Sequence, residues 1–281
     1  MGAESIAIGA VQVLSLADAE GPLHLPPEQI VPGISAELQE PYRRRYPEAF
    51  AEGGLWSAPI GSFLLRSAGR TLLVDTGIGP YPFALMGGVR GRLPDELYTR
   101  GIDLAAIDTV FLTHAHGDHI GWNVLENGSA AFPNARYLIH RADWDWAHHS
   151  ERMAGNASAA RSLTPLEKLG RLELLDGEKR LTDEVTAIHT PGHTPGHMSV
   201  IIASDGEKAL ITGDVLSNPA QVSEPDWVSI FDADGAEAAA TRRALLERIE
   251  AEGMTMVAGH FPRPGFGRVV RLEGRRYWQA L

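Results

Sequence analysis

The sequence predicts a layered α/β fold in which helices pack on β-sheets. Short apolar runs bounded by Gly, Pro or Asp recur along the chain, as is typical of strands. They come first as strands alone and then alternate with helix-like stretches. The clearest helix is Ala236–Ala251, where Leu245, Leu246 and Ile249 recur at core-facing spacing. No linker divides the 281 residues, so we expect a single domain over residues 1–281.

The predicted strands, in chain order, are Ile6–Leu14, Ile60–Leu65, Thr71–Val74, Thr109–Leu112, Arg136–Ile139, Val185–Ile188, Ser199–Ala203, Ala209–Ile211, Met254–Val257 and Arg268–Leu272. Further helices are predicted over Arg141–His149, directly after a strand, and over Ser158–Leu169, where Ser158 is a candidate N-cap. Two segments, Asp18–Gly54 and Gly77–Gly101, are predicted as surface loops, which in compact domains often form lids or pocket walls.

Composition and charge exclude several classes of protein. Because the chain has no cysteine, disulfides, iron–sulfur clusters and thiol nucleophiles are ruled out. A formal net charge of −11 argues against binding nucleic acid through its phosphates. Residues Met1–Leu16 lack the features of a signal peptide, and no apolar run approaches the ~20 residues that span a bilayer. We therefore expect a cytoplasmic protein with no nucleic-acid or membrane partner.

The segment Phe111–His119, FLTHAHGDH, places four candidate metal ligands directly after an apolar strand. His114 and His116 are two residues apart and can point the same way from an extended strand end. Asp118 and His119 follow a turn that Gly117 makes easy, so they diverge, which suits two metal ions better than one. Imidazole and carboxylate ligands suit zinc first, with manganese, cobalt or iron as alternatives.

Three further signals lie downstream. The sequence Thr-Pro-Gly-His occurs twice, ending at His193 and at His197, and the spacing alone does not decide which histidine binds metal. Asp214 ends the apolar run that begins at Leu210, and His260 follows the strand that ends at Val257. Taken alone, Asp214 and His260 are each better explained as a cap or turn residue than as a metal ligand.

In this order the motifs resemble the metallo-β-lactamase superfamily of hydrolases. The similarity consists of H-x-H-x-D-H at residues 114–119, TPGH at His193, GD at Asp214, GH at His260 and Asp-Thr-Gly after Val74. It covers about Ile60 to Arg268 and implies an αββα sandwich with a two-metal site at one edge between the sheets.

The resemblance implies two divalent metal ions. One would be held by His114, His116 and His193, and the other by Asp118, His119 and His260. Asp214 would bridge the two ions. The resemblance implies that Asp118 and Asp214 also act as the catalytic carboxylates. His197 becomes a candidate partner of the ligands rather than a ligand. Asp75 is either such a partner, bonded to a ligand histidine, or a simple turn residue.

Branches of the superfamily differ near these motifs. The commonest β-lactamases carry a cysteine where Asp214 stands, and glyoxalase II adds a C-terminal helical domain, whereas only 21 residues follow His260. Acyl-homoserine lactonases usually carry a tyrosine where Ser217 stands. Segments 213–234 and 260–268 look most like the methyl-parathion-hydrolase branch, close to the lactonases. The resemblance implies hydrolysis of a carboxylic ester, a lactone or a phosphotriester by a metal-bridging hydroxide at a site of net positive charge.

An apolar pocket for a small-molecule substrate should surround this site. Its candidate residues are Phe83, Met86, Trp122, Trp227 and Phe261, with Leu85, Phe231 and Phe266 as further options. Arg263 lies either at the mouth of this pocket or in solvent. Two other functions stay open: a metal-dependent nuclease of the same superfamily, which the net charge disfavours, and a non-enzymatic metal-binding protein on the same fold. A homodimer that uses the early loop is also an option.

Overall fold

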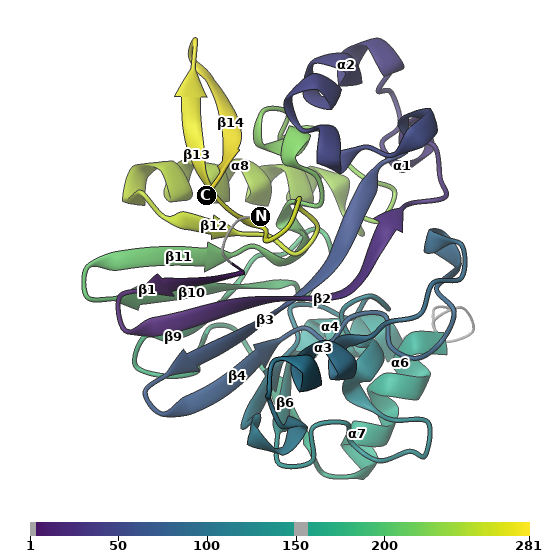
Figure 1. The fold of residues 1–281 in the computed structure, drawn as a ribbon, viewed down its shortest axis with the longest axis vertical. Helices are drawn as coiled ribbons and strands as arrows, with labels where there is room; N and C mark the ends of the chain where they lie inside the picture. The colour runs from purple at the N-terminus through teal and green to yellow at the C-terminus, as the bar shows by residue number, and fades with distance from the viewer. Residues whose placement is uncertain (1–3, 149–156) are drawn as a thin grey trace.

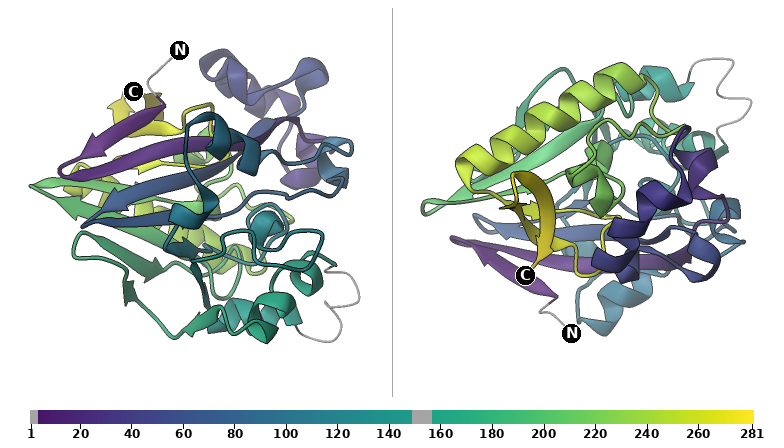
Figure 2. Two further views of the ribbon diagram at one scale, coloured as in Figure 1. Left: turned by 60° about the horizontal axis from the view of Figure 1, so that its bottom comes forward. Right: turned by 90° about the horizontal axis from the view of Figure 1, so that it is seen from above.

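The computed structural model describes residues 4–148 and 157–281, which form two β-sheets packed face to face with helices on their outer faces (Figure 1). Each sheet has seven strands among the described residues, in the order β1-β2-β3-β4-β5-β6-β7 and β14-β13-β12-β11-β10-β9-β8. The views in Figure 2 show the helices on the two outsides of the stack. This is the αββα sandwich that the sequence analysis predicted.

The strands of the first sheet are β1 (Ser5–Ile8), β2 (Val11–Pro22), β3 (Ser57–Ser67), β4 (Arg70–Val74), β5 (Thr109–Phe111), β6 (Arg136–His140) and β7 (Leu172–Leu175). Those of the second sheet are β8 (Lys179–Arg180), β9 (Val185–His189), β10 (Met198–Ser204), β11 (Glu207–Ile211), β12 (Thr255–Val257), β13 (Phe266–Leu272) and β14 (Arg275–Ala280). The helices are α1 (Pro27–Ile30), α2 (Ala36–Arg45), α3 (Leu93–Thr99), α4 (Arg141–His148), α6 (Ala157–Ser162), α7 (Thr164–Lys168) and α8 (Gly235–Glu252).

Strand alternation divides the apolar residues between layers. In β4, Leu72 and Val74 belong to the core between the sheets, whereas Leu73 belongs to the core under the outer helices. In β5, Phe111 faces inward and Val110 outward in the same way. Successive side chains of a strand point to opposite faces, so strands buried on both sides read as continuous apolar runs.

The long helix α8 covers the second sheet. Its Leu245, Leu246 and Ile249 belong to one buried cluster with sheet residues such as Leu210 and Met256. The Asp234 side chain caps the start of the helix by accepting a hydrogen bond from the Glu237 backbone N–H. This helix matches the prediction for Ala236–Ala251 to within a residue at either end.

Several predicted elements differ from the structure. The predicted surface loop Asp18–Gly54 contains the end of β2 and helices α1 and α2, and the loop Gly77–Gly101 contains α3. The predicted strand Ile6–Leu14 is two strands joined at Gly9, whose φ of 55° makes the turn. Within the described residues no helix is long and apolar enough to cross a membrane. His149, predicted at the end of a helix, lies outside the described residues.

Candidate metal centre

The predicted ligands meet where strands of both sheets end. Strands β4 and β5 run parallel, as do β11 and β12, so the carboxyl ends of each pair lie at one edge of its sheet. The segments that follow β4, β5, β9, β11 and β12 carry, in that order, Asp75, residues 114–119, His193, Asp214 and His260. Residues far apart in the sequence therefore meet at one edge of the sandwich.

Three histidines form the first cluster. The Nδ1 atom of His116 lies 3.0 Å from Nε2 of His114 and 2.9 Å from Nε2 of His193. Their ligand atoms lie within 4.8 Å of one another. Three imidazole nitrogens at this spacing could hold a single divalent ion.

The second cluster consists of Asp118, His119 and His260. The Oδ2 atom of Asp118 lies 3.6 Å from Nε2 of His260 and 3.8 Å from Nε2 of His119. The two Nε2 atoms are 3.3 Å apart. This carboxylate and these two imidazoles could hold a second ion.

Asp214 lies between the clusters and turns one oxygen to each. Its Oδ2 is 3.4 Å from Nε2 of His193 and 3.9 Å from Nε2 of His114. Its Oδ1 is 3.2 Å from Nε2 of His260 and 3.4 Å from Nε2 of His119. A carboxylate in this position can serve two ions at once, which is the geometry that a bridging ligand requires.

The other ring nitrogens determine which atoms face the centre. Nδ1 of His119 donates to Asp75, Nδ1 of His193 to Asp232, and Nδ1 of His260 to the Pro59 carbonyl, at 2.8, 2.8 and 2.9 Å. With Nδ1 protonated, a neutral imidazole presents a bare Nε2 lone pair. Such lone pairs repel at the observed spacing unless a proton or a metal ion lies between them, so the donor set fits divalent metal ions that would take the place of those protons.

Asp75 also acts on His114. The Thr113 hydroxyl donates to Oδ2 of Asp75 at 2.8 Å and therefore accepts from Nδ1 of His114 at 3.0 Å. The Thr113 N–H donates to the other Asp75 oxygen at 2.8 Å. Asp75 thus orients one histidine of each cluster, and its role as a partner of the ligands is the alternative that the geometry favours.

His197 is fully buried and contacts Asp214 through the backbone. Its Nε2 accepts from the Asp214 N–H at 2.9 Å, and its Nδ1 lies 2.9 Å from the Thr190 hydroxyl. Gly213 has a φ of 52°, and a Cβ atom there would lie 2.5 Å from Nε2 of His197. Only glycine therefore fits between His197 and the strand end that presents Asp214.

Asp143 connects the loop that carries residues 114–119 to the loop that carries His193. Its buried carboxylate accepts from the Ala115 N–H at 2.8 Å, the Thr194 hydroxyl at 2.9 Å and the Gly196 N–H at 2.6 Å. Burial raises the pKa of Asp143 to about 6 against these hydrogen bonds. Asp143 and Asp232 have no motif of their own in the sequence. Asp232 falls inside the segment 213–234 that carried the branch resemblance, which was its only signal.

The electrostatics of the cluster favour cations. Burial holds the pKa of His114 well below its usual range. Burial also opposes protonation of His260, but the carboxylates of Asp214 and Asp118 outweigh it and raise its pKa to about 9. Burial opposes ionisation of Asp214, yet His260 and His119 hold its pKa well below its usual range. Without metal, the cluster therefore keeps protons that a divalent ion would displace.

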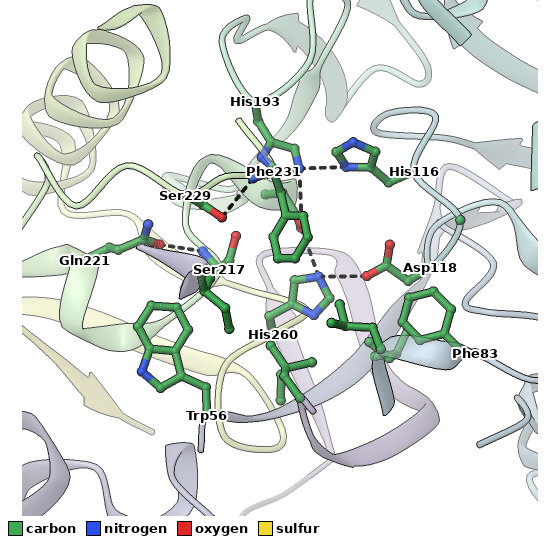
Figure 3. Close-up of a pocket in the computed structure, with 17 residues that line it drawn as sticks. Trp56, Phe83, His116, Asp118, His193, Ser217, Gln221, Ser229, Phe231 and His260 are labelled. Carbon is green, nitrogen blue, oxygen red and sulfur yellow. Dashed lines mark hydrogen bonds and ion pairs between the residues drawn. The ribbon is translucent and has the colours of Figure 1, made fainter. Parts of the chain in front are cut away.

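A cavity of about 220 Å³ opens onto both clusters (Figure 3). Its apolar wall is formed by Leu23, Ile30, Trp56, Ala58, Ile60, Phe83, Leu85 and Phe231. Its polar side chains other than those of the clusters and Asp214 are Ser217, Gln221 and Ser229, and the part of the chain that the structure describes contributes no Lys or Arg to its lining. The amide of Gln221 is already used, because it accepts from the Ser217 N–H and donates to the Trp227 carbonyl.

The structure corrects most of the predicted pocket residues. Of the five, Phe83 lines the cavity, and the other four do not line it. Met86 and Phe261 are buried in apolar clusters, and Trp227 packs edge-on against Tyr42. Trp122 is held elsewhere, because its Nε1–H donates to the buried Asp18 at 2.7 Å.

Sequence reasoning allowed the early segment to form a pocket wall but named none of the residues through which it does so. Leu23, Ile30 and Trp56 line the cavity from the stretch predicted as a surface loop and its flank. The lining also includes Leu85 and Phe231, which the sequence analysis named as further options. Arg263 is not among the residues that line the cavity, and its guanidinium pairs with Glu4 at 3.1 Å.

Comparison with known proteins agrees with this geometry. A family model described as the metallo-beta-lactamase superfamily matches residues 59–260, more than half of the chain. The chain belongs to this superfamily. Every residue of the two clusters and the bridging Asp214 falls within the matched part of this superfamily member.

Curated relatives of this superfamily member include lactonases. An N-acyl homoserine lactonase of Bacillus sp is 27% identical over 168 residues, which are 54% of this chain and 62% of the relative. The N-acyl homoserine lactonase AttM of Rhizobium radiobacter is 24% identical over 75% of this chain and 84% of its own length. An atrochrysone carboxyl ACP thioesterase of Passalora fulva is 27% identical over 61% of this chain, and that match spans only 42% of the relative.

Solved structures share the fold over nearly the whole chain. The hydrolase AbOPH of the beta lactamase superfamily aligns with a TM-score of 0.84 at 24% identity, covering 99% of this chain and 96% of that one. AidC, a dizinc quorum-quenching lactonase in complex with a product, aligns with a TM-score of 0.83 at 24% identity and the same coverage. At this identity the likeness shows the fold.

Proposed function

We propose that this chain is a dinuclear metal-dependent hydrolase of uncharged carboxylic esters or lactones, with phosphotriesters as a third substrate class. The observation that carries the proposal is Asp214, whose two oxygens face two separate clusters at 3.2–3.9 Å. His114, His116 and His193 would hold one ion, and Asp118, His119 and His260 the other. Zinc is the first choice, and manganese, cobalt and iron suit the same ligands.

When bound, paired divalent ions polarise a carbonyl or phosphoryl oxygen and lower the pKa of water toward 7. The chain supplies the rest of the chemistry. The Asp118 side chain is 19% exposed against 9% for Asp214, so Asp118 is the carboxylate better placed to take up a proton from the nucleophile. The histidines are oriented toward the ions because Asp75, Asp232 and the Pro59 carbonyl accept their second N–H groups, which leaves Nε2 to face a metal.

The cavity supports an uncharged substrate. Its wall is mainly aliphatic and aromatic, and within residues 4–148 and 157–281 its lining has no Lys or Arg to receive a carboxylate or phosphate that lies away from the centre. The hydroxyls of Ser217 and Ser229 can donate to a neutral acceptor such as an ester oxygen, and the Ser229 oxygen also accepts from the Phe231 N–H at 3.1 Å. The lactonase and thioesterase relatives support acyl chemistry, which favours esters and lactones over phosphotriesters.

Two other functions receive less support. A nuclease of the same superfamily needs cations along the path of the phosphates, which the described lining does not offer, and the net charge is −11. A non-enzymatic metal protein would not need a cavity that opens onto both clusters. A single domain over residues 1–281, a cytoplasmic location and a homodimer stay predictions.

A substrate panel tests the proposed function. Purified protein loaded with zinc or manganese is assayed on an aryl ester, a γ-lactone, a phosphotriester, the same aryl ester carrying a carboxylate on its acyl chain, and RNA. We expect turnover of the uncharged ester or lactone that chelation abolishes, and weaker turnover of the charged ester. Cleavage of RNA without ester turnover would favour the nuclease, and no turnover at all would favour the non-enzymatic protein.

A further inference from the structure

Helix α8 carries an arginine that is almost entirely buried. The Arg242 side chain is 1% exposed, although charged side chains are rarely buried unless they are paired. Its Nε donates to the Val215 carbonyl at 2.6 Å, and Nη1 donates to the carbonyls of Pro225 and Trp227 at 2.8 and 3.1 Å. Its Nη2 lies 3.6 Å from Oδ2 of Asp232. Every one of these partners belongs to residues 215–232.

Asp232 connects this arginine to the first histidine cluster. Its Oδ1 accepts from Nδ1 of His193 at 2.8 Å, and its Oδ2 accepts from the Ser229 N–H at 2.8 Å. The Asp232 side chain is itself 2% exposed. A buried carboxylate needs a compensating charge, and Arg242 is the cation that faces it among the described residues.

The same segment forms one side of the cavity. Residues 215–232 follow Asp214 directly and include the lining residues Ser217, Gln221, Ser229 and Phe231 (Figure 3). Arg242 bonds to this segment near its start, at Val215, and near its end, at Trp227 and Asp232. One guanidinium therefore lies behind both a candidate metal ligand and the polar side of the cavity.

We propose that Arg242 is a positioning residue that holds His193 toward its metal, through Asp232, and holds segment 215–232 in place as the cavity wall. This inference rests on the proposed function. A guanidinium is a planar group with five donors, so it can reach four acceptors that diverge from one point. A lysine ammonium in its place could reach only some of them, and methionine could reach none.

The test compares R242M and R242K with R248M, a matched control on the same helix whose arginine pairs with Glu252 near the surface. Zinc binding is measured by competition with a chromophoric chelator. KM and kcat are measured on the preferred uncharged ester. Folding is checked by circular dichroism and thermal unfolding. For R242M we expect one zinc equivalent to bind about 10–100-fold more weakly, the usual effect of losing the partner of a ligand histidine. The second equivalent should weaken less, because Asp118, His119 and His260 do not touch Asp232 and the Asp214 that both ions share is also held by His197.

The cavity wall adds a second readout. We expect KM to rise by roughly three- to tenfold in R242M, more than kcat falls, because binding is weakened in the ground state and the transition state alike. R242K should recover part of both losses, and R248M should match the wild type. If R242M does not fold, the same measurements on R242K decide.

The inference would be overturned by a folded variant at Arg242 that keeps both zinc affinities and KM and loses only thermal stability. That result would make the arginine purely structural. Failure of the proposed function gives a different pattern, in which the wild type itself binds no zinc or turns over no ester. If the wild type binds zinc but turns over no ester, KM is not measurable, and a zinc-induced rise in Tm that is as large in R242M as in the wild type would overturn the positioning role. If the wild type binds no zinc, the role of positioning His193 toward a metal fails together with the proposed function.

Discussion

Replacing Asp75 with asparagine tests how the second ring nitrogens orient the ligands. The Asp75 carboxylate accepts three hydrogen bonds at 2.8 Å, from Nδ1 of His119 and from the N–H and hydroxyl of Thr113. Asparagine suits the backbone, since Asp75 has a φ of 61°, a region that asparagine tolerates. Its amide, however, offers only one oxygen, so at least one of the three donors would face the NH₂ group.

The expected effect can be worked out from these contacts. Losing one hydrogen bond to a buried charged group costs about 1.5–3 kcal/mol in the free energy of unfolding of the metal-free protein. Losing a partner of a ligand histidine lowers metal affinity by about 10–100-fold, or about 1.4–2.8 kcal/mol. Because Asp75 acts on His119 directly and on His114 through Thr113, we expect both zinc equivalents to weaken.

The assay is zinc competition with a chelator, together with urea unfolding of the metal-free protein. D108N is the control, since the Asp108 carboxylate also accepts a backbone N–H, from Thr71 at 2.7 Å, but at the opposite ends of β4 and β5. It should lower stability slightly and leave zinc affinity unchanged. A folded D75N protein with the zinc affinities of the wild type would show that the Asp75 carboxylate does not orient the ligand histidines.

The remaining predictions concern pH, the cavity and one glycine. The pKa of His260 is raised to about 9 in the folded protein. In the metal-free protein the protonated His260 therefore stabilises the fold fully below pH 6.5, and this contribution, up to about 3 kcal/mol, is lost as pH rises through 9. Unfolding measured as a function of pH should show this loss without zinc and no such loss with zinc bound. Phe83→Ala should raise KM for apolar esters with little loss of stability, because Phe83 lines the cavity. Met86→Ala should mainly lower the free energy of unfolding, by about 2–5 kcal/mol, and raise KM less than Phe83→Ala does, because Met86 is 2% exposed and packs behind the cavity wall without lining it. Gly213→Ala should weaken zinc binding at Asp214, because the new Cβ would lie 2.5 Å from His197.

Each of these predictions has a contradicting result. A pH-independent unfolding free energy of the metal-free protein between pH 6.5 and 9 would contradict the His260 assignment. Equal KM values for the Phe83 and Met86 variants would contradict the description of the cavity. Wild-type zinc affinity in the Gly213 variant would show that His197 can move without displacing Asp214.

The clusters could be predicted because their residues stand in short motifs at strand ends. The run from His114 to His119 contains four of the seven residues, and a strand followed by a turn brings them near one another whatever the rest of the chain does. Their partners could not be predicted in this way. Asp232 is 39 residues from His193, and Pro59 contributes a backbone carbonyl 201 residues from His260, so neither leaves a local pattern.

The cavity was predicted less well for a physical reason. Large apolar residues near a ligand in sequence fill the core as readily as they line a pocket, and Phe261, adjacent to His260, is fully buried against Trp278. The true wall comes partly from the segment between β2 and β3, where polar composition indicated a loop. Helix α2 in that segment has its Tyr42 and Gln39 buried, and Gln39 accepts from the Trp56 indole at 3.1 Å. Tertiary contacts, rather than apolar periodicity, stabilise that helix.

The proposed function depends above all on Asp214 serving two metal ions at one site. The most direct measurement is the metal content per chain of the wild type and Asp214→Asn, after loading with zinc and removal of free metal, paired with ester hydrolysis before and after chelation. We expect two ions per wild-type chain with turnover that chelation abolishes, and one ion or fewer with little turnover in the variant. Two ions in the variant, or wild-type activity that survives exhaustive chelation, would contradict the proposed function.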